Sequence, residues 1–369
     1  MRLIILADAA APHTRRWAKW FALKGNEVHV ISFNCESLPN YGPVTIHKVW
    51  EYKNNSFIIL RILKFIIILL RIKKIINLFP PDIIHAHSAG GYAWAAALIR
   101  RKPFVITPWG TDLLVDINNS KLNYWLTSKS LTSSDLVTTD GTHFVEILIS
   151  LGVNKEKIYV HPFGTNLNHF YPIKNFTERV ILHISDDAPV IISTRTLNPV
   201  HDVETFIRAI PNVIKIFPKS IFIIVGDGIE RTRFEDLVDE LNISNATRFV
   251  GMVEEDRMCK LLQSSDIYVS TSKLDAGLAA STAEAMAVGL PVIQTDNSDN
   301  SYWTPNGDGG ILFPTGDSKA LSTAIIELIK NYKVREKMGK RNRNKVELEY
   351  NTDIEMSKIE LKYHMLMRG

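Results

Sequence analysis

Cysteine is nearly absent from this sequence, and so is any large excess of charge. Among 369 residues only Cys35 and Cys259 are cysteines, and they lie too far apart in the chain to form a metal-binding pair. A disulfide framework is therefore not expected, and a reducing compartment, the cytoplasm, is favoured. The formal net charge of +4 is too small to indicate nucleic acid as a partner, and no RNA- or DNA-binding motif accompanies it.

Two further signals are missing. The Gly-x-Gly-x-x-Gly fingerprint of dinucleotide-binding folds does not occur, which argues against a nicotinamide enzyme. The apolar run at the amino terminus stops at Asp8, too early for a secretion signal. We therefore expect residues 3–7 to form a first β-strand.

Strand-like and helix-like segments alternate along the chain in two successive runs. The first run opens with a strand at 3–7, a helix at 14–24 and a strand at 28–33. The second restarts at 190–194, after a segment rich in turn-forming residues at 162–172. Strand–helix–strand units build parallel sheets with right-handed crossovers. The pattern predicts an α/β protein with two doubly wound, Rossmann-like domains that face a central cleft, where the active site is expected.

The chain length supports two domains, because a single hydrophobic core rarely grows beyond roughly 250 to 300 residues. We predict an N-terminal domain at residues 1–165 and a C-terminal domain at 166–350. Residues 351–369 read as a last helical segment that packs on the surface and could return to the first domain.

The stretch 264–294 reads as strand, glycine-bearing loop, helix and strand. Its centre is the loop 275–282, which leads into a predicted helix at 283–288. Helix N-termini carry unpaired backbone N–H groups and partial positive charge, so this loop is a candidate phosphate-binding site. The alternative is an ordinary crossover whose helix is capped by a Ser or Thr side chain.

Residues 57–79 are almost continuously Ile and Leu, interrupted by five cations: Arg61, Lys64, Arg71, Lys73 and Lys74. So many charges argue against a membrane-spanning helix. Arg61, Lys64 and Arg71 fall in one narrow sector of a helix, a pattern typical of a basic amphipathic helix on an anionic membrane surface. The alternative is a core helix whose one polar stripe faces water.

Polar and aromatic residues gather where two predicted strands end. The strand 81–87 ends with His85 and His87, and the strand 104–107 is followed by a loop that contains Trp109 and Asp112. Ligand sites of open parallel sheets lie at the carboxyl ends of strands. A His-x-His pair can bind a metal, but no third ligand is evident nearby, so contacts to a substrate hydroxyl are favoured.

Several strings resemble, in their order and spacing, the retaining nucleotide-sugar glycosyltransferases of glycosyltransferase family 4, group 1, which have the GT-B fold. The similarity covers nearly the whole chain. The strings are PHTRRWAKWFALKGNEVHVIS, PDIIHAHSAGGY, TPWGTDLL, FGTNLNHFYP, STRTLNPVHDVETFIRAI, VGDG, VGMV and, the most specific, EAMAVGLPVI.

The resemblance implies transfer of a sugar from a UDP- or GDP-linked donor to a hydroxyl acceptor, with retention of configuration and without a metal or other cofactor. The expected acceptor is a lipid-linked or cell-surface glycan precursor. Glu284 would bind the ribose, Arg195 the diphosphate, and Asp275 would lie near the donor sugar. The implied donor site comprises Arg195, Gly226, Gly251, Gly277, Leu278, Ala279, Ala280, Ser281, Thr282 and Glu284, and the implied acceptor site His13, His87, Trp109 and Asp112.

The chain departs from the family pattern at three places. The first of two family glutamates falls at Ala276, one residue after Asp275. The family's lysine falls near Val200, beside His201, and a histidine of many members is replaced at Trp109. Two alternatives therefore stay open: a non-catalytic GT-B scaffold subunit at the membrane and a nucleotide-sugar epimerase. In each case we expect a cytoplasmic chain that can lie on the inner face of the cell membrane.

Overall fold

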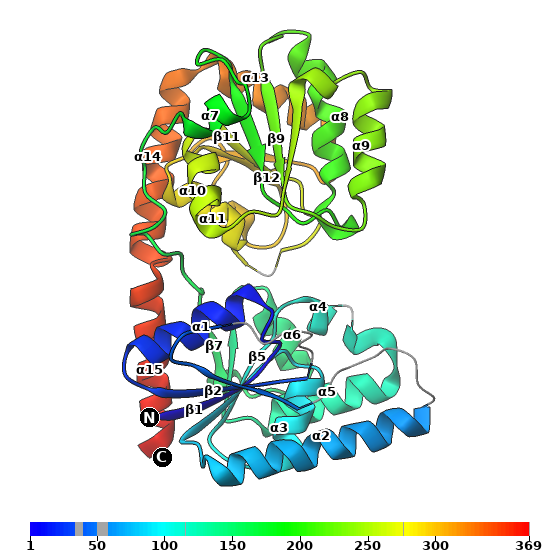
Figure 1. Ribbon diagram of the computed structural model, residues 1–369, viewed down its shortest axis with the longest axis vertical. Coiled ribbons are helices and arrows are strands. Elements are labelled where there is room, and N and C mark those ends of the chain that lie inside the picture. Colours follow the sequence, from blue (N-terminus) through cyan, green and yellow to red (C-terminus); the bar gives the residue numbers. More distant parts are fainter. Residues whose placement is uncertain (34–39, 50–57, 115, 276, 369) are drawn as a thin grey trace. The chain divides into compact units, whose positions relative to one another are not determined.

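The computed structural model describes residues 1–33, 40–49, 58–114, 116–275 and 277–368, with side chains from residue 63 onward in the helix that starts at 58 (Figure 1). Cys35, Phe57 and Ala276 lie outside the described residues. The chain divides into two compact units, Met1–His161 with Met356–Gly369, and Pro162–Glu355. The boundaries predicted from the sequence lie after residues 165 and 350.

The first unit is built on a parallel sheet with the strand order β3-β2-β1-β4-β5-β6-β7. β1 and β4 are neighbours, with Ile4 opposite Ile84, although the connections from them run in opposite directions across the sheet. Their carboxyl ends therefore form the place where ligands bind in such sheets. The strands are β1 (Arg2–Leu6), β2 (Glu27–Ser32), β3 (Thr45–Lys48), β4 (Ile83–His87), β5 (Phe104–Thr107), β6 (Leu136–Thr139) and β7 (Ile158–Val160).

Helices cover both faces of this sheet. α2, α3 and α5 follow one another in contact and form one layer, whereas α1 packs against β2 on the other side with the C-terminal helix α15 beside it (Figure 1). The helices are α1 (Pro12–Leu23), α2 (Ile58–Leu78), α3 (Gly91–Ile99), α4 (Thr111–Leu114), α5 (Lys121–Ser133), α6 (Phe144–Ser150) and α15 (Thr352–Arg368). Among the described residues, no helix has both the length and the apolar character needed to cross a bilayer.

The carboxyl end of the chain is part of the core of the first unit, whereas the sequence predicted a helical segment that packs on the surface and could return to the first domain. α15 buries Met356, Ile359 and Tyr363 completely or nearly so. The Tyr363 ring stacks on Phe21 with 5.3 Å between centroids, and its hydroxyl lies 2.6 Å from Nδ1 of His85. The polar composition of this segment belongs to its outer face, while every third or fourth residue faces inward.

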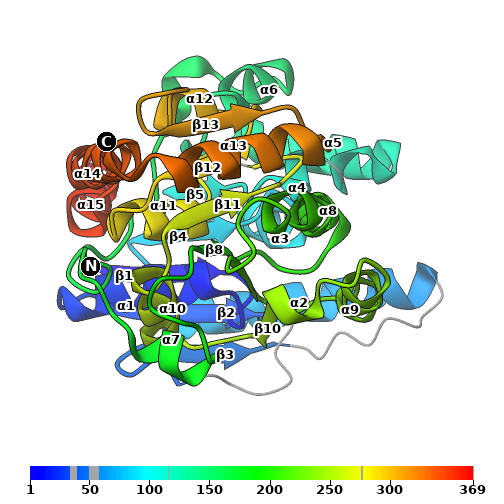
Figure 2. The same ribbon diagram turned by 90° about the horizontal axis from the view of Figure 1, so that it is seen from above.

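The second unit has a parallel sheet with the order β10-β9-β8-β11-β12-β13, which can be followed from above in Figure 2. β8 and β11 meet where the strand order reverses, with Ile191 opposite Ile267. The strands are β8 (Val190–Ser193), β9 (Ile221–Val225), β10 (Thr247–Gly251), β11 (Ile267–Ser270), β12 (Val292–Thr295) and β13 (Gly310–Phe313).

Each face of the second sheet has its own hydrophobic core. Ile191 of β8 belongs to one cluster, while its neighbours Val190 and Ile192 belong to the other. Strands covered on both faces need apolar residues at every position, which explains their unbroken apolar sequences. The covering helices are α7 (Thr177–Ile181), α8 (Val203–Ile214), α9 (Arg231–Glu240), α10 (Glu255–Gln263), α11 (Ala280–Ala287), α12 (Asn300–Trp303), α13 (Ser318–Lys330) and α14 (Tyr332–Glu349). The predicted class, two doubly wound α/β domains, is confirmed.

Candidate active site

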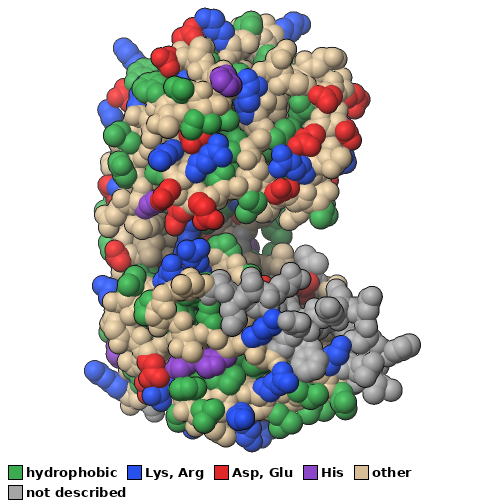
Figure 3. All heavy atoms as spheres, viewed as in Figure 1, with side chains coloured by type: hydrophobic (Ala, Val, Ile, Leu, Met, Phe, Trp, Pro, Cys, Tyr) green, Lys and Arg blue, Asp and Glu red, His purple; other side chains and the backbone are tan. Residues whose placement is uncertain are grey.

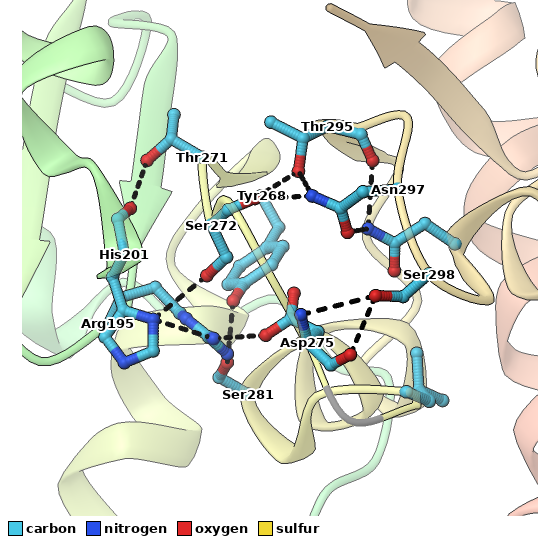
Figure 4. A network of polar contacts seen from close by, with 12 residues as sticks. Arg195, His201, Tyr268, Thr271, Ser272, Asp275, Ser281, Thr295, Asn297 and Ser298 are labelled. Carbon is cyan, nitrogen blue, oxygen red and sulfur yellow. Dashed lines mark hydrogen bonds and ion pairs between the residues drawn. The ribbon is translucent and has the colours of Figure 1, made fainter. Parts of the chain in front are cut away.

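The loops that follow β8 and β11 carry Arg195 and Asp275 to the point where the strand order of the second unit reverses (Figure 4). Connections leave β8 and β11 on opposite sides there, so a crevice opens at their carboxyl ends. Three of the residues that the sequence predicts for the donor site, Arg195, Asp275 and Ser281, are joined there by hydrogen bonds.

Arg195 and Asp275 form a buried ion pair. Nη2 of Arg195 donates to Oδ1 of Asp275, and the two side chains are only 9% and 5% exposed. Nη1 donates to the hydroxyl of Ser281 at 3.0 Å. The remaining donor, Nε, is buried and has no hydrogen-bond partner among the described residues. One edge of the guanidinium is therefore fixed, while one N–H of a buried positive charge has no partner among the described residues.

His201 supports the guanidinium from the other side. Its Nδ1 lies 3.0 Å from Nη2 of Arg195 and 3.0 Å from the hydroxyl of Ser272. Because a guanidinium only donates hydrogen bonds, Nδ1 must be an acceptor, and the ring proton resides on Nε2. Burial, with a smaller contribution from the Arg195 charge, lowers the pKa of His201 to about 3. The imidazole is therefore neutral near pH 7.

Burial has the largest effect on Asp275 and raises the pKa of its carboxyl above the usual value. The Arg195 guanidinium opposes this rise by stabilising the carboxylate. The backbone of Asp275 is also held in place, because the Ser298 hydroxyl donates to its carbonyl at 2.7 Å. The loop after β11 is fixed again at Ser272, whose carbonyl accepts from the Thr295 hydroxyl at 2.6 Å.

α11 begins next to this pair. It starts at Ala280 rather than at Ala283, so Ala280, Ser281 and Thr282 form its first turn and not a loop. Its N-cap, Ala279, makes no side-chain hydrogen bond, which excludes the Ser/Thr cap considered as the alternative. The first intrahelical hydrogen bond is donated by Ala283 to Ala279. The N–H groups before it are those that an anion binds at a helix N-terminus.

The other predicted donor residues have different surroundings. Glu284 lies one turn into α11 and is 7% exposed, and Thr282 is fully buried. Gly277 has a φ of +132°, which favours glycine at the entry to the helix. Leu278 packs its side chain into the core, and its carbonyl accepts from the Tyr350 hydroxyl at 3.0 Å. Its side chain therefore belongs to the core of the unit.

Gly226 and Gly251 end the neighbouring strands β9 and β10. Gly226 has a φ of +129° and donates its N–H to the Gly251 carbonyl at 2.9 Å. A Cβ atom on Gly226 would collide with the backbone carbonyl of Arg195. Glycine at this position allows the Arg195 loop to pack directly on the end of β9.

The predicted acceptor residues His13, His87 and Trp109 come together in the first unit. His13, in the first turn of α1, has its ring centroid 3.7 Å from that of Trp109. His87, at the end of β4, lies edge-on to Trp17 at 5.0 Å and to Trp109 at 5.4 Å. Neither ring nitrogen of His87 has a hydrogen-bond partner among the described residues.

Burial keeps these histidines neutral. It lowers the pKa of His13 to about 4, with help from the charge of Arg16. It lowers the pKa of His87 well below the usual value, with smaller contributions from His85 and His13. His85 differs from His87 because both of its nitrogens are engaged, with Thr107 at 2.6 Å and Tyr363 at 2.6 Å.

Asp112 organises the loop after β5. Its carboxylate accepts backbone N–H groups of Ala89 at 2.6 Å and of Trp109 and Gly110 at 3.0 Å each. Burial raises the pKa of Asp112, and these hydrogen bonds oppose the rise. The side chain therefore fixes the backbone that presents Trp109.

Three residues of the network in Figure 4 were not predicted as site residues: Ser272, Ser298 and Tyr268. Tyr268 lies on β11, is fully buried and donates to the Ser281 hydroxyl at 2.9 Å. The feature of the sequence that could have indicated Ser272 is the run of polar residues at the end of β11. Among the described residues, no group of three or more His, Cys, Asp or Glu side chains is placed to hold a metal ion.

Two family models match the chain, one in each unit. Residues 2–141 match "Glycosyl transferase 4-like" and residues 174–345 match "Glycosyl transferases group 1". A Bacillus anthracis protein, N-acetyl-alpha-D-glucosaminyl L-malate synthase, is 27% identical over 310 residues, which cover 78% of this chain and 75% of that protein. A Corynebacterium glutamicum protein, GDP-mannose-dependent monoacylated alpha-(1-6)-phosphatidylinositol monomannoside mannosyltransferase, is 30% identical over 205 residues, 52% of each chain.

Solved structures with the same fold cover the whole chain. Sucrose-phosphate synthase from Thermosynechococcus elongatus has a TM-score of 0.86 at 19% identity and covers 100% of both chains. Anabaena HepE in complex with UDP-glucose has a TM-score of 0.84 at 17% identity, covering 99% of this chain and 100% of the other. At these identities the likeness concerns the fold.

Proposed function

The chain belongs to the GT4-type group 1 glycosyltransferases with the GT-B fold, and from this premise we propose that it is a retaining, metal-independent enzyme that uses a UDP- or GDP-linked sugar. The acceptor in this proposal is a hydroxyl of a lipid-linked or cell-surface glycan precursor. The observation that carries the proposal is the Arg195–Asp275 pair beside the uncapped N-terminus of α11.

In the donor complex, the diphosphate lies between Arg195 and the first turn of α11. The Nε–H of Arg195 and the N–H groups of Ala280 and Ser281 provide donors for its oxygens. The ribose hydroxyls donate to the carboxylate of Glu284, one turn further along the helix. The sugar is then directed towards Asp275, whose position is fixed by Arg195 and Ser298.

The reaction breaks the bond between the anomeric carbon and the diphosphate oxygen. Negative charge grows on the departing diphosphate, where the Arg195 guanidinium and the dipole of α11 stabilise it. The acceptor oxygen attacks the oxocarbenium-like carbon from the face that the diphosphate leaves, and its proton passes to a diphosphate oxygen. Configuration is retained, and no strong base is required.

The acceptor is held by the first unit. The aromatic rings of Trp109 and His13 provide a surface for a sugar ring, and a nitrogen of His87 provides a partner for a hydroxyl. Asp112 fixes the loop that presents Trp109. A lipid-linked acceptor is supported by the names of relatives, among them a phosphatidyl-myo-inositol mannosyltransferase of Mycobacterium leprae that is 29% identical over 151 residues.

A thermal-shift screen of UDP- and GDP-linked sugars, followed by transfer assays with the stabilising donor, tests the proposal. A donor that binds only the folded chain raises the melting temperature, and at a given concentration a tighter donor raises it more. We expect a shift with at least one donor and slow hydrolysis of that donor in the absence of acceptor. No shift with any donor favours the scaffold alternative, and interconversion of donors without acceptor favours the epimerase.

A further inference from the structure

The outer face of α2 is unusually apolar for a helix on a protein surface. Ile68, Ile72 and Ile76 recur every four residues and are at most 4% exposed, so they define the inner face. Four large side chains on the outer face are 48–63% exposed: Leu63, Ile66, Leu70 and Leu78. Surface helices normally turn charged and polar residues outward, so these four require an explanation.

Cations accompany this apolar ridge. Lys73 and Lys74 follow Leu70 by three and four residues, and both are exposed. α2 contains no acidic residue. Of the basic stripe predicted from the sequence, Arg71 is exposed, although it donates to the Val49 carbonyl at 2.6 Å, and Lys64 is half-buried. The Arg61 side chain lies outside the described residues. Lys73 and Lys74 are therefore the exposed cations that lie beside Leu70.

The neighbouring helices of the same layer continue the pattern. α5 buries Thr127, Ser130 and Leu131. On its opposite face, Leu122 is 62% exposed, Trp125 is 60% exposed, and Lys129 is also exposed. Trp is enriched where proteins meet the headgroup region of a bilayer. Figure 3 shows hydrophobic and basic side chains side by side along the lower edge, where α2 runs.

We propose that the outer face of the α2–α3–α5 layer docks on an anionic lipid bilayer. The docking face consists of Leu63, Ile66, Leu70 and Leu78 of α2 with Leu122 and Trp125 of α5, flanked by Lys73 and Lys74. The apolar side chains enter the boundary between headgroups and acyl chains, and the lysines contact anionic headgroups. This places the first unit on the membrane without a spanning segment.

Charge decides between the possible occupants. A second copy related by twofold symmetry would bring the same patch against itself, and neither α2 nor α5 contains an acidic residue that could pair with Lys73 and Lys74. A nucleic acid would use the lysines but would leave the leucines exposed. An anionic bilayer can bury the apolar side chains among its lipids and also pair its headgroups with the two lysines. The proposal does not depend on the catalytic function, because the docking face contains none of the donor or acceptor residues.

Vesicle flotation of the full chain tests the proposal. We expect the protein to float with vesicles that contain phosphatidylglycerol and to remain in the soluble fraction with phosphatidylcholine alone. High salt should weaken binding, because it screens the lysines. Binding that is equal for the two kinds of vesicle, or absent for both, overturns the proposal.

Two double variants probe the face itself. Lys73→Glu/Lys74→Glu and Leu70→Ser/Leu78→Ser should each lower vesicle binding by roughly tenfold or more, since each surface lysine and each buried methylene adds to the affinity. Lys333→Glu/Lys337→Glu and Leu348→Ser are matched controls, because these exposed residues lie on α14 in the other unit. Unaltered melting temperatures and donor-induced thermal shifts show that a loss of binding does not come from misfolding.

The outcome can also identify a different occupant. If light scattering shows a dimer that the α2 variants convert to a monomer while vesicle binding stays at the wild-type level, the face is a self-association surface and the membrane proposal is wrong. If the α2 variants and the α14 controls lower flotation equally, binding is due to overall charge and the proposed face is wrong.

Discussion

Arg195 and Asp275 lie 80 positions apart in the chain, and the fold brings them into a buried ion pair at the carboxyl ends of β8 and β11. The guanidinium is held at once by Asp275, Ser281 and His201, while Nε has no partner among the described residues. A donor diphosphate therefore meets an arginine whose orientation is already fixed, so little conformational entropy is lost when it binds.

Removal of the Asp275 carboxylate should destabilise the second unit. Asp275→Ala leaves a buried guanidinium without its counter-charge, which we expect to cost about 3–5 kcal/mol in urea unfolding. Asp187→Ala, which breaks a pair with Lys219 whose side chains are 63% and 69% exposed, should cost far less, because solvent screens an exposed pair.

The double variant Arg195→Met/Asp275→Leu extends this test. Replacing both members of a buried pair removes both charges, so its cost should be smaller than the sum of the two single losses. Strictly additive losses would mean that the two side chains do not act as a pair.

Gly226→Ala should disturb the Arg195 loop. The added Cβ collides with the Arg195 carbonyl, and a φ of +129° is strained for alanine. We expect a loss of stability and a fall in donor affinity. Gly316→Ala is the matched control, since Gly316 has a φ of +79° but nothing within 4 Å of the added atom. Equal effects of the two substitutions on donor affinity would show that the contact with Arg195 is unimportant.

Acidification should destabilise the chain from about pH 6.5 downward. The folded-state pKa is lowered to about 4 for His13 and to about 3 for His85, His161 and His201. At pH values between these pKa values and 6.5, the unfolded chain binds more protons than the folded chain. The free energy of unfolding therefore falls as the pH falls. Each histidine contributes roughly 1 kcal/mol per pH unit in this window.

Urea unfolding between about pH 7.5 and 5.5 measures this slope. His201→Gln should make the slope less steep by the contribution of one histidine. A slope that His201→Gln does not alter would mean that this imidazole titrates alike in the folded and unfolded states.

The hydroxyl of Tyr363 should stabilise the first unit through His85. Tyr363→Phe removes the 2.6 Å contact and leaves a buried imidazole nitrogen unpaired, which we expect to cost about 1–3 kcal/mol. Tyr171→Phe, at a half-exposed position in the second unit, is the control and should cost close to nothing. Donor-induced thermal shifts should be unaffected by both changes.

The sequence predicted the fold well because buried strands such as β8 and β9 are apolar at nearly every position, and turn-forming residues separate them. It missed β3, a half-buried edge strand with an alternating, weakly apolar pattern. It also missed β13, because this short strand starts at Gly310, within the glycine-containing segment 306–310 that is typical of a loop.

The details of the site were harder to predict. The start of α11 was placed at Ala283 because Ser281 and Thr282 resemble capping residues, whereas the actual N-cap is Ala279. The partners of Arg195 could not be read from the sequence, since Asp275 and Ser281 reach it only through the strand order of the sheet. The role of Tyr363 was missed for the same reason, because its partner His85 lies 278 positions away.

Calorimetric titration of UDP- and GDP-linked sugars into the wild-type chain and into Arg195→Ala tests the central claim most directly. The account predicts that at least one donor binds the wild-type chain and that Arg195→Ala weakens this binding by roughly tenfold or more, as expected for loss of a charge-assisted hydrogen bond to a phosphate. Equal affinities of the two proteins for that donor would contradict the account.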